Sequence, residues 1–351
     1  MKTAVILFNL GGPDSLEAVQ PFLFNLFYDP AIIRLPKPLR WLVARLISSR
    51  RAPVARAIYA RMGGRSPIVE NTEAQALALE QELGDEFKTF IVMRYWHPRA
   101  AAQVSAVAAW RPDRILLVPL YPQYSTTTTG SSAREWQAAA ARIGLDVPTK
   151  TLCCFPTQPG FIKAASDRVR EGLRALPRSQ PARVLFSAHG LPKKIIDAGD
   201  PYQWQVEQTV AAIRNELDMP GLDSVICYQS RVGPLEWIGP STEAEIRRAA
   251  QSGISLLVVP VAFVSEHSET LVELDIEYRE LAHREGPVAY QRVPTVDVAA
   301  SFIEGLASEI RRVPWAGTTA MVHGPCGRIC PVEFKACPCR AGDDIPAGRV
   351  A

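Results

Sequence analysis

Short apolar runs alternate with longer amphipathic stretches along most of this 351-residue chain. The short runs end near Gly or Pro, and uninterrupted apolar runs of that length are typical of parallel strands covered on both faces. They predict strands at residues 4–9, 89–95, 114–120, 182–187, 224–228 and 255–262. The amphipathic stretches predict helices at residues 72–83, 102–109, 133–143, 161–176, 203–217, 242–252, 267–284 and 296–312. Such alternation indicates an α/β fold with parallel sheets.

A weak internal repeat divides the chain. The segment from Val5 to Pro13 resembles the segment from Val184 to Pro192, and residues 114–121 resemble residues 255–262. Self-similarity of this kind predicts two similar α/β halves, with a hinge near residues 151–159. We therefore expect three parts: a first half at 1–150, a second half at 151–299, and a C-terminal helix with a Cys-rich tail at 300–351.

The first half carries an insertion, at about residues 21–67, that has no counterpart in the second half. It is rich in Phe, Leu and Ile, with arginines interspersed, including Arg40, Arg45 and Arg51. Packing into a core is the default interpretation. A basic amphipathic stretch can also lie on a membrane surface or line an apolar ligand cleft. The residues alone favour neither interpretation.

Composition narrows the class of protein. Hydrophobic residues make up 47% and charged residues 21%, which is ordinary for a globular protein, and a net charge of +3 is too small to indicate nucleic-acid binding. The first ten residues read as a buried strand, because they lack the long apolar core and cleavage site of a signal peptide. No stretch approaches the ~18–20 apolar residues of a membrane span. We expect a cytoplasmic protein.

An acidic segment stands out near residue 270. Six acidic residues fall between Glu266 and Glu280, and Glu269, Glu273 and Glu277 recur at every fourth position. In a helix these three would share one face, where each like-charge pair costs roughly 0.2–0.5 kcal/mol. A solvated helix face is the common explanation, but apolar residues interleave with the acids. The stripe therefore predicts a path that holds a cation or carries protons.

His189 directly follows a predicted strand and precedes Gly190. Ligands of parallel α/β folds bind beyond the carboxyl ends of strands, where an imidazole can accept a proton or bind a metal. Imidazole together with carboxylate suits Fe(II), Mn(II) or Zn(II). The chain has no His-Glu-x-x-His motif and no Gly-rich phosphate loop. A metalloprotease and a nucleotide-binding protein are therefore disfavoured.

The chain has seven cysteines, an odd number that argues against a disulfide framework. Four of them crowd into the tail with the spacing Cys-x3-Cys-x6-Cys-x-Cys: Cys326, Cys330, Cys337 and Cys339. Four thiolates suit a zinc site or an iron–sulfur cluster. The absence of Cys-x2-Cys pairs favours a [2Fe–2S] cluster over zinc, and a flexible tail with incidental thiols is the remaining alternative. After Trp315 we expect an appendage to the folded body.

Ordered motifs over essentially the whole body of the chain resemble one family. They are Asn9–Pro13, Gly63–Ile68, Met93–Pro98, Tyr121–Ser125, Ser187–Pro192, Gly199–Tyr202, Gln229–Pro234, Trp237–Pro240 and His267–Tyr278. In these motifs the chain resembles the ferrochelatases, which insert ferrous iron into a porphyrin in the last step of haem biosynthesis. The resemblance implies two Rossmann-like, chelatase-type halves, each a parallel sheet flanked by helices, with a porphyrin cleft between them.

The resemblance also implies roles for individual residues. His189 and Glu269 resemble the two essential active-site residues, and with Glu273 and Glu277 they would form the metal and proton path. The insertion would hold the cleft lips, which face the membrane in members that draw substrate from it. The expected substrate-binding residues are Leu10, Arg51, Tyr59, Ser66, Arg94, Tyr95, Tyr124, Trp237 and Phe263.

One position departs from the cluster-bearing animal ferrochelatases, which take a cysteine ligand where this chain has Thr126. The resemblance supports a [2Fe–2S] cluster without fixing its ligands. Cys326 could complete a set with Cys330, Cys337 and Cys339, or Cys153 or Cys154 could replace it.

The resemblance implies a bacterial-type ferrochelatase acting on protoporphyrin IX in preference to coproporphyrin III. It would lie in the cytoplasm, peripherally on the inner membrane face, and could form a homodimer. Two other interpretations stay open. One is a chelatase for another tetrapyrrole, such as one inserting cobalt, and the other is a non-catalytic porphyrin-binding iron–sulfur redox sensor.

Overall fold

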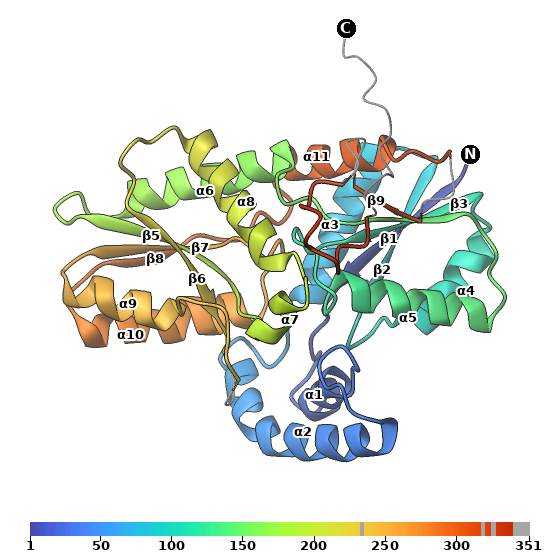
Figure 1. The fold of residues 1–351 in the computed structure, drawn as a ribbon, viewed down its shortest axis with the longest axis horizontal. Coiled ribbons are helices and arrows are strands. Elements are labelled where there is room, and N and C mark those ends of the chain that lie inside the picture. The colour runs from blue at the N-terminus through green and yellow to red at the C-terminus, as the bar shows by residue number, and fades with distance from the viewer. Residues whose placement is uncertain (232–234, 317–319, 324–327, 340–351) are drawn as a thin grey trace, which may run out of the picture. The chain divides into compact units, whose positions relative to one another are not determined.

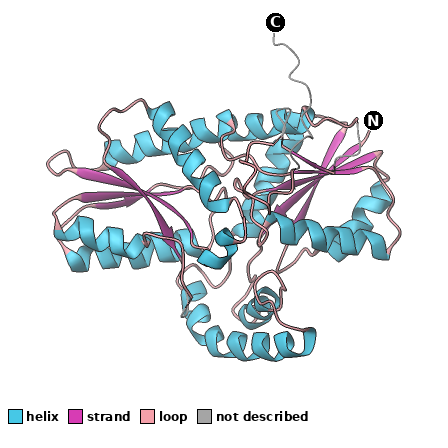
Figure 2. Ribbon diagram, in the orientation of Figure 1, coloured by secondary structure: helices cyan, strands magenta, loops and turns pink. Residues whose placement is uncertain are grey.

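The computed structural model describes residues 1–231, 235–316, 320–323 and 328–339. The chain divides into two compact units, each with its own parallel sheet (Figures 1 and 2). The first unit comprises residues 1–121, 125–153 and 313–322, and the second comprises residues 122–124, 154–312 and 323–351. The chain passes from the first unit to the second between Cys153 and Cys154, and residues 313–322 return to the first unit.

The sheet of the first unit has the strand order β2-β1-β3-β4-β9, and every pairing is parallel. All seven residues of its central strand β1 are buried, because strands pair with both its edges and side chains cover both its faces. The strands are β1 (Thr3–Asn9), β2 (Phe87–Met93), β3 (Arg114–Pro119), β4 (Thr149–Leu152) and β9 (Met321–Val322). The helices are α1 (Val19–Phe27), α2 (Lys37–Ala60), α3 (Ile68–Leu83), α4 (Ala100–Trp110) and α5 (Thr129–Arg142).

The sheet of the second unit has the strand order β6-β5-β7-β8, again all parallel. Helices α6 and α8 lie along one face of it, and α9 and α10 along the other (Figure 1). The strands are β5 (Ala182–His189), β6 (Ser224–Gln229), β7 (Ser255–Pro260) and β8 (Tyr290–Arg292). The helical segments are α6 (Pro159–Ala175), α7 (Lys193–Asp197), α8 (Tyr202–Leu217), α9 (Thr242–Gln251), η1 (Glu269–Glu277), α10 (Tyr278–Glu285) and α11 (Ala300–Arg311).

The internal repeat is confirmed by topology. The order β2-β1-β3-β4 in the first unit matches β6-β5-β7-β8 in the second. The two segments that begin at Val5 and Val184 form the central strands β1 and β5, and the other echoing pair forms β3 and β7. Central strands are buried on both faces, so their apolar sequences stay alike. The predicted α/β class with two similar halves is therefore correct.

The insertion of the first unit forms a pair of helices, α1 and α2, that pack against each other (Figure 1). Sequence patterning predicted no element here, because the buried face of α2 holds small or polar residues such as Ala44 and Ser48, whereas large apolar residues such as Trp41 and Leu42 are exposed. Strands β4, β8 and β9 were also missed, and each has four residues or fewer. In the described part of the chain, no helix combines the length and apolarity needed to cross a membrane.

The acidic segment is not the single α-helix predicted at residues 267–284. A π-helix, η1, runs from Glu269 to Glu277, and an α-helix, α10, follows it from Tyr278. A π-helix closes i→i+5 hydrogen bonds and is rare, and it is frequently found at functional sites. The hydrophobic period over nine residues is too short to separate a π-turn from an α-turn, so the sequence indicated helix without its type.

Candidate active site and thiol cluster

His189 is the last residue of β5, at the carboxyl edge of the second unit's sheet. The backbone turns away immediately after it, at Gly190. A Cβ at Gly190 would lie 2.8 Å from the carbonyl oxygen of Gln229, which explains a glycine at this position. The hydroxyl of Tyr202, on α8, donates to the carbonyl oxygen of His189 at 3.0 Å. The backbone that carries the imidazole is therefore held on two sides.

Glu269, the first residue of η1, lies directly against this histidine. Its Oε2 is 2.8 Å from His189 Nδ1. The same oxygen accepts hydrogen bonds from Ser230 Oγ at 3.1 Å and from Gln229 Nε2 at 3.3 Å. The hydroxyl of Ser187 donates to Gln229 Oε1 at 2.7 Å, which orients that amide toward the carboxylate. Three donors thus converge on one carboxylate oxygen at the carboxyl edge of the sheet.

Ser230 joins Glu269 to Glu273, one turn further along η1. The Ser230 N–H donates to Glu273 Oε1 at 2.9 Å, and its hydroxyl also reaches Glu273 Oε2. Tyr278 donates to Glu273 Oε1 at 2.9 Å. Sequence reasoning assigned no role to Ser230, although it lies two residues after the predicted strand at 224–228 and within the motif Gln229–Pro234. Its backbone has φ 59°, a left-handed conformation that aims both donors at the acidic helix.

Burial and charge separate the proton affinities of these three groups. Burial opposes the charged form of Glu269, but His189 beside it outweighs burial and lowers the pKa of Glu269 to about 2. Burial also opposes protonation of His189, but Glu269 and Glu273 raise its pKa above the usual value. Burial and then the Glu269 charge raise the pKa of Glu273 to about 7. The site therefore combines an imidazole–carboxylate pair with a carboxyl group that exchanges a proton near neutral pH.

Other residues of the second unit were also predicted to belong to the site, among them Glu277, Phe263 and Trp237. Glu277 is the last residue of η1 and is half-buried. The ring of Phe263 lies 4.6 Å from that of His267, centroid to centroid. Trp237 pairs with Pro192 in an isolated β-bridge, and its buried indole Nε1 has no hydrogen-bond partner among the described residues. Their roles toward a substrate stay predictions.

The predicted residues of the first unit fall into three environments. Leu10, Tyr59 and Tyr95 belong to one apolar cluster, formed with side chains of α1. Ser66 is buried, and its N–H donates to the carbonyl of Pro13 at 2.8 Å. Arg51 is exposed on α2. All of these residues were predicted to bind substrate. In the structure Arg51 is exposed, whereas the others are buried or partly buried.

Arg94 is embedded in a buried polar network. Its guanidinium lies 2.8 Å from Asp29 Oδ2 and 3.1 Å from Glu135 Oε2, and Nε donates to Ser131 at 2.8 Å. Tyr95 donates to the same Asp29 oxygen at 2.8 Å. The Asp29 side chain is only 1% exposed. These bonds hold the end of α1 to the sheet, so the geometry favours a positioning role for Arg94.

Cys154, at the point where the chain enters the second unit, lies near the tail residue Cys330. Cys154, Cys330, Cys337 and Cys339 are all buried, and none of the described cysteines is in a disulfide. Nε2 of Gln205, on α8, lies 3.4 Å from Cys154 Sγ and 3.1 Å from Cys330 Sγ. Cys326 lies outside the described residues. Within the described part of the chain, no three His, Cys, Asp or Glu side chains form a ready metal-binding group.

Residues 328–339 do not form the expected appendage. Arg328 donates to the backbone carbonyls of Cys330 at 2.8 Å and Cys339 at 3.1 Å, which folds this segment around one guanidinium. The ring of Phe334 packs on that of Trp204 at 5.8 Å, centroid to centroid. Cysteine spacing could not reveal the contact between Phe334 and Trp204, because it joins segments far apart in the sequence.

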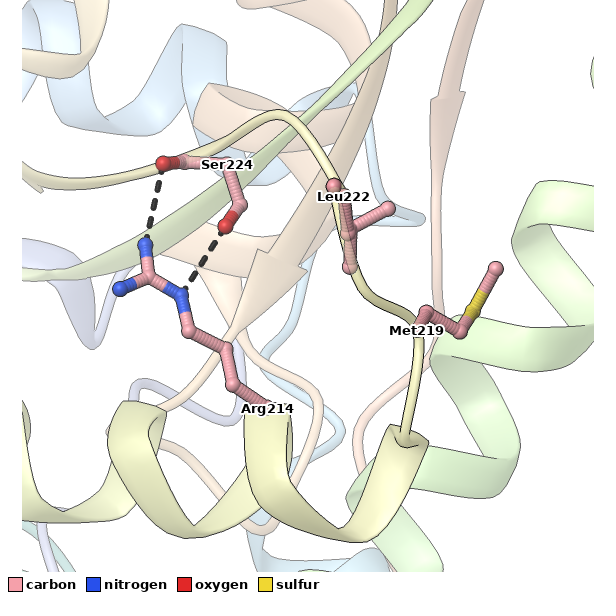
Figure 3. Close-up of a pocket in the computed structure, with 5 residues that line it drawn as sticks. Arg214, Met219, Leu222 and Ser224 are labelled. Carbon is pink, nitrogen blue, oxygen red and sulfur yellow. Dashed lines mark hydrogen bonds between the residues drawn. The ribbon is translucent and has the colours of Figure 1, made fainter.

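A hollow of about 380 Å³ lies away from the His189–Glu269 pair (Figure 3). It is lined by the end of α8 and the start of β6, including Arg214, Met219 and Leu222. Arg214 donates to the hydroxyl and the carbonyl of Ser224, both at 3.0 Å. Since β6 begins at Ser224, this hollow is at the amino edge of the sheet, opposite the edge where parallel α/β folds bind ligands.

Comparison with known proteins identifies the family. The model of the family described as Ferrochelatase matches residues 2–313. The chain belongs to the ferrochelatase family. It is 50% identical to a ferrochelatase of Pelagibacter ubique over 345 residues, covering 97% of this chain and 99% of that one. A Caulobacter vibrioides ferrochelatase is 51% identical over 347 residues, covering 97% and 98%.

Solved structures agree on the fold. The sirohydrochlorin chelatase SirB from Bacillus subtilis subspecies spizizenii, in complex with cobalt, matches with a TM-score of 0.53 and 13% identity. The match covers 89% of this chain and 95% of that chain. At this identity the likeness shows the chelatase-type fold alone. In this ferrochelatase fold, His189 and the acidic helix η1 meet at the carboxyl edge of one sheet.

Proposed function

We propose that this chain inserts Fe(II) into protoporphyrin IX to form protohaem, in the last step of haem biosynthesis. The observation that carries the proposal is the 2.8 Å contact between His189 and Glu269, backed by Glu273. Family membership and relatives named ferrochelatase support it. Nothing specific favours coproporphyrin III, cobalt insertion or a non-catalytic redox sensor.

The chemistry requires two pyrrole protons to leave while Fe(II) exchanges water for nitrogen ligands. A divalent cation favours deprotonated imidazole and carboxylates, so its arrival expels protons from this site. Neutral His189 then accepts one pyrrole proton, with Glu269 stabilising the imidazolium. Glu273, whose pKa of about 7 suits proton exchange at neutral pH, takes the second proton. Glu277, at the end of η1, would continue this path outward.

An anaerobic assay tests the proposal. Purified protein is mixed with Fe(II) and protoporphyrin IX, and loss of free-porphyrin fluorescence is followed over time. Multiple turnovers per chain are expected, with coproporphyrin III and Co(II) as competing substrates in parallel reactions. Porphyrin binding without turnover would contradict the enzyme proposal and favour the redox sensor. Faster turnover with coproporphyrin III would correct the substrate alone.

Glu273→Gln is expected to stabilise the protein at alkaline pH. The folded state raises the pKa of Glu273 from 4.5 to about 7. Its ionisation therefore destabilises the fold progressively as pH rises from 4.5 to 7, and the full cost, on the order of a few kcal/mol, remains above pH 7. Urea unfolding should show the variant gaining stability over wild type at pH 8 but not at pH 4.5. An equal difference at both pH values would contradict the burial argument.

We propose further that the thiols hold a [2Fe–2S] cluster through Cys154, Cys330, Cys337 and Cys339, with Cys154 in place of Cys326. The four sulfurs are buried, and Gln205 and Cys337 both hydrogen-bond to Cys330. A zinc site needs ligands around one point, whereas a two-iron cluster spreads its four thiolates over two metals. When bound, such a cluster supplies a one-electron redox centre. No step of iron insertion requires it.

We also propose a peripheral position on the cytoplasmic face of the inner membrane. Helix α2 exposes large apolar side chains among arginines, including Leu39, Trp41, Leu42 and Leu46. This arrangement suits the interface of an anionic bilayer. Trp41→Ala with Leu42→Ala should reduce co-sedimentation with anionic vesicles, whereas Leu77→Ala, an exposed leucine on α3, should not. Unchanged sedimentation together with loss of a dimer in ultracentrifugation would instead assign α2 to a homodimer contact.

A further inference from the structure

Gln205 is a buried amide that faces the thiol cluster. It lies in the first turn of α8, and its exposed fraction is 0%. Its Oε1 accepts the backbone N–H of Tyr124 at 2.7 Å. A backbone N–H can only donate, so the oxygen of the amide must point toward Tyr124. The Nε2 group, a donor with two hydrogens, is thereby directed to the opposite side.

On that side Nε2 meets two sulfurs. It lies 3.4 Å from Cys154 Sγ and 3.1 Å from Cys330 Sγ, within the range of hydrogen bonds to sulfur. One amide therefore has one hydrogen for each of two cysteines that come from distant parts of the chain. Two other polar side chains near the thiols contact backbone carbonyl groups. His323 Nδ1 is 3.0 Å from the Cys154 carbonyl oxygen and 3.6 Å from the Cys154 sulfur. Arg328 bonds carbonyl groups.

Donors at sulfur favour negative charge on it. A reduced [2Fe–2S] cluster carries one more electron than an oxidised one, and part of that charge resides on its thiolates. A hydrogen bond to the sulfur consequently stabilises the reduced state more than the oxidised state and raises the reduction potential. A neutral, fully buried amide exerts this effect without screening by water.

We propose that Gln205 is a positioning residue that orients Cys154 and Cys330 as ligands and raises the reduction potential of the cluster. The inference rests on the proposed cluster. It assigns the two tasks to separate atoms: Oε1 anchors the side chain to Tyr124, and Nε2 acts on the two sulfurs.

Two substitutions separate these atoms. Gln205→Glu keeps an acceptor for the Tyr124 N–H but replaces the donor with a negative charge. Gln205→Met removes the donor without adding charge and keeps similar length and a weakly accepting sulfur. Gln203→Leu is the matched control, because Gln203 is in the same turn and contacts Glu207 instead of the thiols.

The readouts are iron and inorganic sulfide per chain and the midpoint potential from an anaerobic titration with dithionite, followed by visible absorption. Wild type and the Gln203→Leu control should have equal potentials. Gln205→Met should keep its cluster and titrate at a more negative potential, and Gln205→Glu should shift further in the same direction. Circular dichroism establishes that each variant is folded.

Two failures are distinguishable. Wild-type protein, assembled anaerobically with iron and sulfide, that retains neither would overturn the cluster proposal and this inference with it. Variants that hold the cluster and titrate at the wild-type potential would overturn the role of Gln205 alone. A Gln205→Glu protein that folds but loses iron, beside a Gln205→Met protein with a shifted potential, would support the assignment.

Discussion

Replacing Glu269 by glutamine is expected to lower the rate of iron insertion at least about 100-fold, because general acid–base groups typically contribute 10²–10⁴-fold. Glutamine has nearly the same shape and can still accept hydrogen bonds from Ser230 and Gln229. It carries no charge, however, so it cannot stabilise a protonated His189 or attract a divalent cation. The effect should appear mainly in kcat, since the porphyrin does not need this charge to bind.

His189→Ala should produce a loss of the same order, and the double variant should be little worse than either single one. Groups that act as a unit are non-additive in this way. Glu280→Gln, an exposed residue in the following helix α10, is the matched control and should keep wild-type turnover. Full activity in both Glu269→Gln and His189→Ala would refute the mechanism while leaving the family assignment intact.

Replacing Cys154 by serine is expected to remove the iron–sulfur cluster. The variant should lose the visible absorption of the cluster together with its iron and sulfide. Because the free energy of metal binding contributes to folding when the ligands come from distant segments, stability should fall by about several kcal/mol. Urea unfolding under anaerobic conditions measures that loss. The unliganded tail segment 328–339 would keep the bonds of Arg328, the packing of Phe334 and the hydrogen bond from the Ala336 N–H to the Gly199 carbonyl.

Two neighbouring cysteines provide the controls for that experiment. Cys153→Ala changes the adjacent buried residue and should leave iron and sulfide unchanged. Cys326→Ser changes the first tail cysteine and should also leave them unchanged. Loss of the cluster in Cys326→Ser but not in Cys154→Ser would show that the ligand set is the one suggested by tail spacing alone.

Much of the fold could be predicted from local pattern. The six apolar runs all form strands, because strands buried on both faces need continuous apolar sequence. The similarity of the runs beginning at Val5 and Val184 predicted two halves with one topology. The elements that were missed are short or amphipathic without a clear face, such as β8, β9 and α2. Their conformations depend on what they pack against.

The candidate site was only partly predictable. Residue types and spacing indicated His189 and the acidic stripe of Glu269, Glu273 and Glu277. The imidazole follows a strand, and the carboxylates interleave with apolar residues, which favours proton or cation handling over a solvated helix face. The family resemblance supplied their roles. Neither source assigned a role to Gln205 or to Ser230, which lies in one of the family motifs, since serine and glutamine are common and carry no chemical signature. Their importance comes from position alone.

By itself, the sequence determined the class of fold, the repeat, the family and the residues able to do the chemistry. The class of fold follows from local periodicity, the repeat from similarity between segments, and the family from the resemblance of its ordered motifs. The chain carries all of these whatever its distant contacts. Only the tertiary structure decided that His189 meets Glu269, that Arg94 is paired with Asp29, and that Cys154 joins the tail thiols. A hydrogen bond requires two atoms to lie within about 3 Å. For residues far apart in sequence, that distance depends on strand register and helix packing, which local pattern does not specify.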